Sequence, residues 1–118
     1  MNNPKSLLVW QKSIYFVKEI YLITAEFPKE ESFALSQQLR RAAISISSNI
    51  AEGSGRGTNS EFAHFLDIAQ GSAYEIETQL IIANLLNYID KNEFDKLNAF
   101  IIEIQKMLNG LIHKVRHE

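Results

Sequence analysis

Polar side chains recur at helical spacing between residues 37 and 53, and their types suit hydrogen bonding rather than solvation alone. They form a stripe at steps of three and four residues, made up of Gln38, Arg41, Ser45, Asn49 and Glu52. A solvated helix face is usually rich in lysine and glutamate, whereas this stripe holds small polar groups and a candidate ion pair between Arg41 and Glu52. The pattern therefore indicates a surface that meets another helix, another subunit or a ligand.

A second polar stripe occurs later in the chain at the same spacing and holds Ser72, Glu75 and Gln79. Facing stripes on two helices can form a hydrogen-bonded network, and buried polar groups require such partners. A polar network between helices or subunits, formed by both stripes together, is therefore the favoured interpretation. Two alternatives stay open: a ligand pocket that uses Arg41 and Glu75, and plain exposure to solvent.

A glycine-rich loop follows the first stripe, with Gly53, Gly55 and Gly57 around Arg56. Backbone amides at the start of the next helix, together with the Arg56 guanidinium, are suited to hold a phosphate. The spacing matches neither the Walker signature nor the dinucleotide fingerprint, and no strand pattern precedes it. A helix end followed by a flexible turn is therefore the main interpretation, with a contact to a nucleic-acid phosphate as the alternative.

The residues that could support catalysis or metal binding do not have the spacing that such a site requires. Glu61 and His64 have the spacing used by carboxylate-bridged metal bundles, but such a site needs a second pair that the sequence lacks. His113 and His117 lie one turn apart near the C-terminal end, where cations suit the helix dipole. The chain has no cysteine, and no serine has an activating spacing to a base. We therefore expect no catalytic residue, no metal site and no cofactor.

The composition is that of a globular protein with a single domain, residues 1–118, because 46% of the residues are hydrophobic and 22% are charged. The net charge of -2 disfavours nucleic-acid binding by bulk electrostatics alone. The charge is uneven, since residues 1–58 carry +2 and residues 59–118 carry -4. No apolar run approaches the roughly 20 residues of a membrane helix, and the first residues lack the apolar segment of a signal peptide. We therefore expect a cytoplasmic protein without a membrane partner.

Hydrophobic periodicity and helix-breaking residues divide the chain into four predicted helices, at residues 7–26, 30–53, 59–87 and 91–115. Pro28 is suited to the first turn of the second helix. Thr58 with Glu61, and Asp90 with Glu93, have the spacing of N-caps for the third and fourth helices. Long helices with short connections predict an all-α, antiparallel up-down-up-down four-helix bundle.

More apolar surface is present than one such bundle normally hides. The apolar residues beside the main stripes are Tyr15, Phe16, Ile81, Ile82, Phe100, Ile102 and Ile112. Exposed patches of this kind usually mark an interface, so we expect the chain to bind copies of itself. Gly71 lies within the third helix, where glycine destabilises by about 1 kcal/mol relative to alanine. We therefore expect a neighbouring backbone to pack closely against Gly71.

Several motifs carry a family resemblance. They are VWQKS at residues 9–13, FP at 27–28, QLRRAAISI at 38–46, SNIAEG at 48–53, EF at 61–62, FL at 65–66 and GSAYEIETQL at 71–80. Over about residues 7–90 the chain closely resembles the four-helix-bundle proteins encoded within 23S rRNA intervening sequences. It departs from them in having Ser47 where proline is common, so a kink in the second helix is expected to be weaker. It also has Ala34 where glycine is common.

The resemblance implies a small bacterial four-helix bundle that assembles as a ring-like homopentamer and has no established enzymatic activity. The chain is also similar to the accessory bundle proteins of diversity-generating retroelements, which bind nucleic acid and a reverse transcriptase. We therefore expect a non-enzymatic protein associated with RNA, with rRNA as a candidate partner. In a pentamer each weak phosphate contact is repeated, so avidity offsets the negative charge of one subunit.

The candidate nucleic-acid-binding residues are Lys12, Arg40, Arg41 and Arg56. Of the adjacent arginines, Arg40 is expected to face solvent and touch a partner, and Arg41 to take part in the polar network. The alternative function is a protein-interaction or scaffold module that docks a protein partner through the polar stripe and does not bind nucleic acid directly.

Overall fold

The computed structural model describes residues 3–31 and 34–118. Over these residues the chain forms four α-helices, α1 (Leu8–Thr24), α2 (Leu35–Ser54), α3 (Asn59–Leu85) and α4 (Lys91–Arg116). Two short 3-10 helices, η1 (Pro4–Ser6) and η2 (Lys29–Glu31), precede α1 and α2. The described residues contain no strand, and the prediction of an all-α protein with four helices is confirmed.

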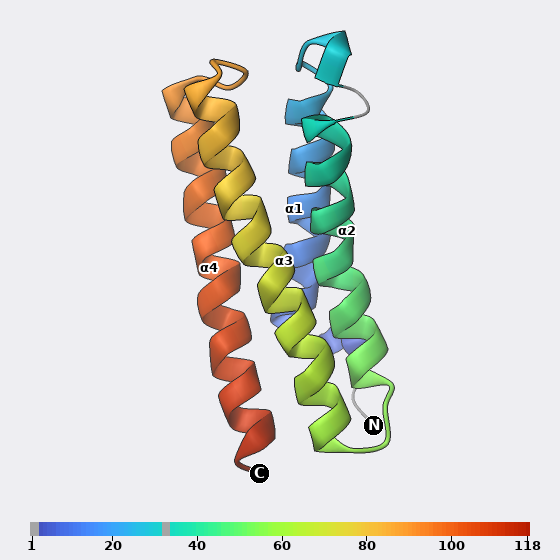
Figure 1. The fold of residues 1–118 in the computed structure, drawn as a ribbon. Helices are drawn as coiled ribbons and strands as arrows, with labels where there is room; N and C mark the ends of the chain where they lie inside the picture. The colour runs from blue at the N-terminus through green and yellow to red at the C-terminus, as the bar shows by residue number, and fades with distance from the viewer. Residues whose placement is uncertain (1–2, 32–33) are drawn as a thin grey trace.

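The helices lie side by side in an elongated body of 45 × 23 × 20 Å (Figure 1). The end of α1, the start of α2 and the connection between α3 and α4 lie at one end of this body. The connection between α2 and α3 and the C-terminus lie at the other end. The pair α2 and α3 packs most extensively, whereas α1 and α4 make the thinnest contact, which leaves a groove between them.

Side-chain caps start α3 and α4 at the predicted residues. The Thr58 hydroxyl accepts a hydrogen bond from the Glu61 amide at 3.1 Å, and the Asp90 carboxylate accepts one from the Glu93 amide at 2.8 Å. These bonds satisfy amides that have no carbonyl partner within the first helical turn. Asn87 follows α3 with a φ of 62°, a left-handed conformation that asparagine tolerates well, and turns the chain toward α4.

The second helix begins later than the sequence predicts. The turn η2 is separate from α2 and closes through a 2.9 Å hydrogen bond from the Glu31 amide to the Pro28 carbonyl. Ala34 has a φ of -126° and a ψ of -108°, outside the helical region, so α2 starts at Leu35 and not near residue 30. Pro28 therefore leads into a 3-10 turn rather than into the first turn of α2. The remaining helix ends lie within two residues of the predicted positions.

One apolar core runs along the bundle and takes side chains from all four helices. Its fully buried large residues are Phe16, Ile20, Leu39, Ile46, Ile50, Leu66, Ile76, Leu80, Ile101, Ile104 and Leu108. Burying one such side chain stabilises the fold by about 1.5–3 kcal/mol relative to leaving it exposed. Phe16 of α1 packs edge-on against Phe100 of α4, with ring centroids 5.1 Å apart.

The apolar residues predicted beside the main stripes divide into two groups. The core or its edge takes up Phe16, Phe100 and Ile112, and Ile102 is half-buried. Solvent remains in contact with Tyr15, Ile81 and Ile82. The interpretation of Phe16 and Ile112 as surplus surface is wrong, since both are buried. For Phe16 the cause is the aromatic contact with Phe100 across the bundle.

An ion pair ties the last turn of α4 to α3. The Arg116 guanidinium donates hydrogen bonds to the Asp67 carboxylate. The hydrogen bond, followed by the attraction between the two charges, raises the pKa of Arg116 above its ordinary value. Because both side chains are about half exposed, the contribution of this pair to stability is small.

Two glycines in the helices have opposite surroundings. A Cβ on Gly53 would lie 2.7 Å from the Cβ of Phe65 and 3.2 Å from the carbonyl oxygen of Phe62, so glycine lets the end of α2 approach α3. A Cβ on Gly71 would meet no atom of the described chain within 4 Å. The expected close approach to Gly71 therefore does not occur within the described part of the chain, because that position lies on the exposed side of α3.

Gly53→Ala is expected to lower the free energy of unfolding by about 1–3 kcal/mol, because the added methyl overpacks the contact between α2 and α3. Gly110→Ala is the matched control, since a Cβ there meets open space on α4. It should raise stability by up to about 1 kcal/mol through helix propensity. Urea denaturation of both variants measures the difference, and equal stability of the two would contradict the close contact at Gly53.

Candidate functional site

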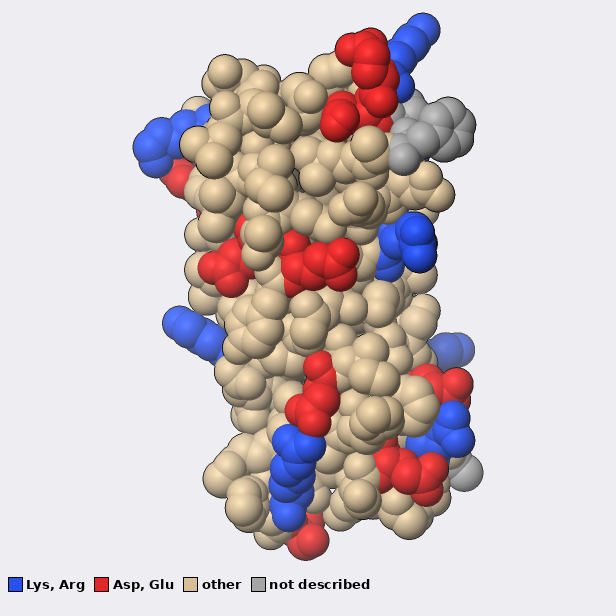
Figure 2. Space-filling model, in the orientation of Figure 1, with Lys and Arg blue, Asp and Glu red and all other residues tan. Residues whose placement is uncertain are grey.

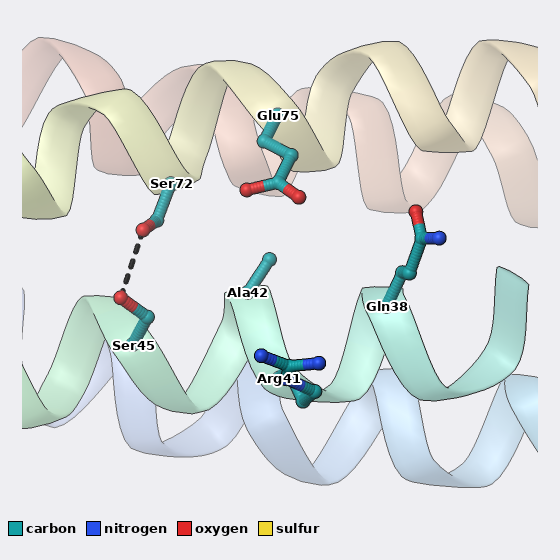
Figure 3. Close-up of a pocket in the computed structure, with 6 residues that line it drawn as sticks. All are labelled: Gln38, Arg41, Ala42, Ser45, Ser72 and Glu75. Atoms are coloured by element: carbon teal, nitrogen blue, oxygen red, sulfur yellow. Dashed lines mark hydrogen bonds between the residues drawn. The ribbon is translucent and has the colours of Figure 1, made fainter. Parts of the chain in front are cut away.

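Polar side chains of α2 and α3 meet along the solvent side of their interface. The Ser72 hydroxyl donates to the Ser45 hydroxyl at 2.9 Å (Figure 3), and the Asn49 amide donates to the Ser45 carbonyl at 2.8 Å. About two turns away, the Gln79 amide donates to Gln38 at 3.3 Å. The two predicted polar stripes therefore face each other across the helix pair.

A hollow of about 390 Å³ lies between these contacts and is open to solvent. This surface, called the α2–α3 groove, is lined by Gln38, Arg41, Ala42, Ser45, Ser72 and Glu75. Glu75 extends from α3 toward α2 (Figure 3), and its carboxylate accepts a hydrogen bond from Gln79 at 3.1 Å. Arg41 and Glu75 are both exposed, and no salt bridge joins them or holds either to another described residue.

Two members of the predicted polar network, Arg41 and Glu52, form no bond with the other members. The ion pair predicted between Arg41 and Glu52 is wrong, because eleven residues along one helix separate the two by about 16 Å. Glu52 instead pairs with Arg56, with Nε and Oε2 3.7 Å apart. Arg41 forms no hydrogen bond through its side chain with the described part of the chain, although it lines the groove.

A second polar layer lies between α3 and α4 and is not predicted by the polar stripes in the sequence. The buried Gln70 amide donates to the Gln105 carbonyl at 2.9 Å and to the Asn109 side chain at 2.7 Å, and the Gln105 amide donates to Glu77 at 2.9 Å. The available signal was the occurrence of glutamine at positions that border the apolar stripes. These bonds satisfy the side-chain N–H groups of Gln70 and Gln105 and link α3 to α4, which indicates a structural role, whereas the buried Gln70 Oε1 has no partner among the described residues.

The adjacent arginines Arg40 and Arg41 differ from their predicted roles, since Arg40 is the one held by contacts within the bundle and Arg41 is the one that is exposed. The sequence predicts that Arg40 faces solvent, whereas in the structure it is half-buried against α1. Its Nε donates to the Thr24 hydroxyl at 2.8 Å, its Nη2 donates to the Tyr21 carbonyl at 3.3 Å, and its guanidinium lies 4.4 Å from the Tyr21 ring centroid. Successive helical residues point about 100° apart, so Arg41 faces the α2–α3 groove while Arg40 faces α1.

The other two candidate cations also have partners. Lys12 of α1 pairs with Glu103 of α4 at 2.7 Å. Arg56 lies 3.7 Å from Glu52 and 3.8 Å from Glu61, and its guanidinium lies over the Phe65 ring. An anion bound in the glycine-rich loop would therefore compete with two carboxylates for Arg56.

The four candidate cations do not form one basic patch in a single chain, since they lie against different helix pairs. On the face drawn in Figure 2, Lys and Arg side chains alternate with Asp and Glu. Such a surface has no extended positive region for a phosphate backbone. Arg41 is the candidate cation that this arrangement leaves available to a partner.

The described residues offer no group of three or more side chains that could hold a metal ion. Glu61 and His64 are exposed, and His113 and His117 lie with ring centroids 4.3 Å apart. None of the helices in residues 3–31 and 34–118 combines the length and hydropathy of a membrane span. The fold and these surfaces define a four-helix protein with a polar groove between α2 and α3.

The comparisons identify the family. The model of the 23S rRNA-intervening sequence proteins matches residues 5–110, and the chain belongs to this family. It is similar to a crystal structure of a protein of unknown function from the S23 ribosomal protein family of Bacteroides thetaiotaomicron VPI-5482, with 29% identity and a TM-score of 0.81. That alignment covers 89% of this chain and 98% of the other. The comparison with curated proteins gives no match. Neither the family nor the solved relative points to catalysis.

Arg40→Ala is expected to lower the free energy of unfolding by about 1–2 kcal/mol, because it removes two hydrogen bonds and the contact with the Tyr21 ring. Arg41→Ala removes the same charge from an exposed position, so its effect should stay within about 0.5 kcal/mol. Chemical denaturation compares the two. An Arg41 variant as destabilised as the Arg40 variant would contradict the assignment of Arg40 as the structural arginine.

Proposed function

We propose that this protein is a non-catalytic assembly subunit: an up-down-up-down bundle that binds further copies of itself and presents a shared surface to protein partners. The observation that carries the proposal is the exposed side of α3. We call this surface the α3 outer face. It consists of eight exposed residues at helical spacing: Ile68, Gly71, Tyr74, Glu75, Thr78, Ile81, Ile82 and Leu85.

Large apolar side chains dominate the α3 outer face. Five of its eight residues are aliphatic or aromatic and are between 40% and 75% exposed, with Leu85 the most exposed. Glu75 is the one charged residue among the eight. Contiguous apolar surface of this kind is uncommon on monomers and typical of interfaces, because burial against a second copy removes it from water.

Gly71 supports a close contact at the middle of this face. Glycine destabilises a helix by about 1 kcal/mol relative to alanine, and no packing within the described chain requires it here. A helix of another copy that packs directly on the α3 backbone would require the absence of a side chain. Arg41 and Glu75 border the same region with opposite charges that are unpaired within the described chain, so they are available to pair between copies.

Five copies in a ring are the assembly that the family resemblance supports. A ring arises when contacts between two unlike surfaces repeat until they close. The α3 outer face supplies one of these surfaces. A scaffold built in this way multiplies any weak docking site by the number of subunits, so partners bind with avidity.

Nucleic-acid association is the second candidate function, and the observation that favours it is the exposed, unpaired guanidinium of Arg41. In a ring of five copies this charge recurs five times. Lys12 and Arg56 add charges that are partly neutralised by carboxylates, and Arg40 adds a charge that is held against α1 by neutral groups. Multivalent contact with rRNA is then compatible with a net charge of -2 for each chain.

Gly71→Ala tests self-association, because the methyl group obstructs a close intersubunit contact while it favours the helix of the free subunit. We expect the dissociation constant of the assembly to rise roughly tenfold or more. Gly110→Ala is the matched control: the two substitutions make the same helix-propensity change at exposed positions with open space. Sedimentation velocity over a concentration series measures both, and unchanged association of Gly71→Ala would overturn the role of the α3 outer face.

Filter binding of structured rRNA fragments across a salt series tests the second candidate. Arg41→Ala should weaken binding at low salt and reduce the salt slope by about 1 for each subunit that contacts the RNA. Glu30→Gln serves as a surface control that makes the chain less negative, because Glu30 is exposed and forms no salt bridge with the described residues. Absence of binding at low salt, or binding insensitive to Arg41→Ala and to charge removal at Arg56, would exclude nucleic-acid association through these residues.

A further inference from the structure

A second groove lies between α1 and α4, away from the polar network. Two adjoining hollows of about 410 and 220 Å³ share Glu19, Glu93 and Lys96. The larger is also lined by Leu22, Ile23 and Glu26, and the smaller by Leu97 and Phe100. Together they form the α1–α4 groove, which follows from the thin contact between these two helices.

The floor of the α1–α4 groove is apolar. Leu97 is buried at its base, and Ile23 and Phe100 are half-buried beside it. Leu22 is 57% exposed at the edge. An apolar side chain of a partner that covered this floor would remove area from water at roughly 25 cal/mol for each Å².

The rim of the groove is acidic and not neutralised. Glu19 and Glu26 border it on the α1 side, Glu93 lies on α4, and Lys96 is its one cation. None of the three carboxylates forms a salt bridge within the described residues. The groove therefore combines an apolar floor with an excess of negative charge.

We propose that the α1–α4 groove docks an amphipathic basic helix of a partner protein, with apolar side chains on the floor and Lys or Arg at the rim. Glu19 lies in α1 and Glu26 lies in the turn two residues beyond Thr24, the last residue of α1, and both border the groove. The apolar stripe of such a helix, at i, i+3, i+4 and i+7, faces the floor, and cations along the edges of this stripe lie nearest the rim carboxylates. An acidic segment is disfavoured, because like charges would meet at the rim.

The test uses a fluorescein-labelled leucine–lysine peptide of about four helical turns, with apolar and basic residues on opposite faces. A leucine–glutamate peptide of the same pattern is the charge-reversed probe. Fluorescence anisotropy at low salt should show binding of the lysine peptide and at least about tenfold weaker binding of the glutamate peptide. Equal binding of the two peptides overturns the proposal, because it would show non-specific apolar contact.

Matched variants locate the binding site. Glu19→Gln with Glu26→Gln should weaken binding of the lysine peptide about three- to tenfold. Glu52→Gln with Glu118→Gln removes the same charge outside the groove and should have a smaller effect. Leu22→Ala should weaken binding, whereas Leu8→Ala, with the same 57% exposure on the same helix, should not.

Equal effects within either pair of variants overturn the proposal, since they would place the peptide elsewhere. The groove could instead be covered by a second copy of this chain. Light scattering of the variants without peptide distinguishes this alternative from a peptide-binding groove. If Leu22→Ala or the double glutamate variant lowers the mass of the assembly, the groove is an interface between copies and the proposal is wrong. Binding by the peptide and self-association through α3 are read out separately, so each can fail without the other.

Discussion

The close packing of α2 against α3 is the contact on which the rest of the structure depends. Gly53 lets the end of α2 approach Phe62 and Phe65 of α3, and the buried stripes of both helices continue the contact along the bundle. With the helices held at this distance, the hydroxyls of Ser45 and Ser72 meet at 2.9 Å. The same pair positions the α2–α3 groove on its open side, so the polar groups there are a consequence of how the core packs.

This packing also decides which charges are available to a partner. The orientation of α2 about its axis places Arg40 against the Tyr21 ring of α1 and Arg41 in the α2–α3 groove. Lys12 and Arg56 pair with carboxylates. A cation that is already paired attracts a phosphate less than a free one, because the existing contact must be broken. The exposed surface is thus better suited to contacts with proteins, through apolar side chains and single charges, than to a continuous phosphate backbone.

The four helices follow from local patterns, because apolar periodicity and the caps at Thr58 and Asp90 involve residues close in the sequence. The residue at which α2 starts does not follow from these patterns, because it depends on the non-helical conformation of Ala34 after the η2 turn. The surroundings of Arg40 depend on the rotation of α2 relative to α1, which no single-helix pattern contains. The facing of the two polar stripes was predictable from their spacing, whereas the layer around Gln70 depends on the register of α3 against α4.

The mass of the unmodified protein in solution tests the central claim of self-assembly most directly. Multi-angle light scattering behind size exclusion, at micromolar concentration, should give a multiple of the 13.5 kDa chain, and five copies in a ring should give five times that mass. A mass of one chain at every concentration would contradict the assembly, and with it the role assigned to the α3 outer face and to Gly71.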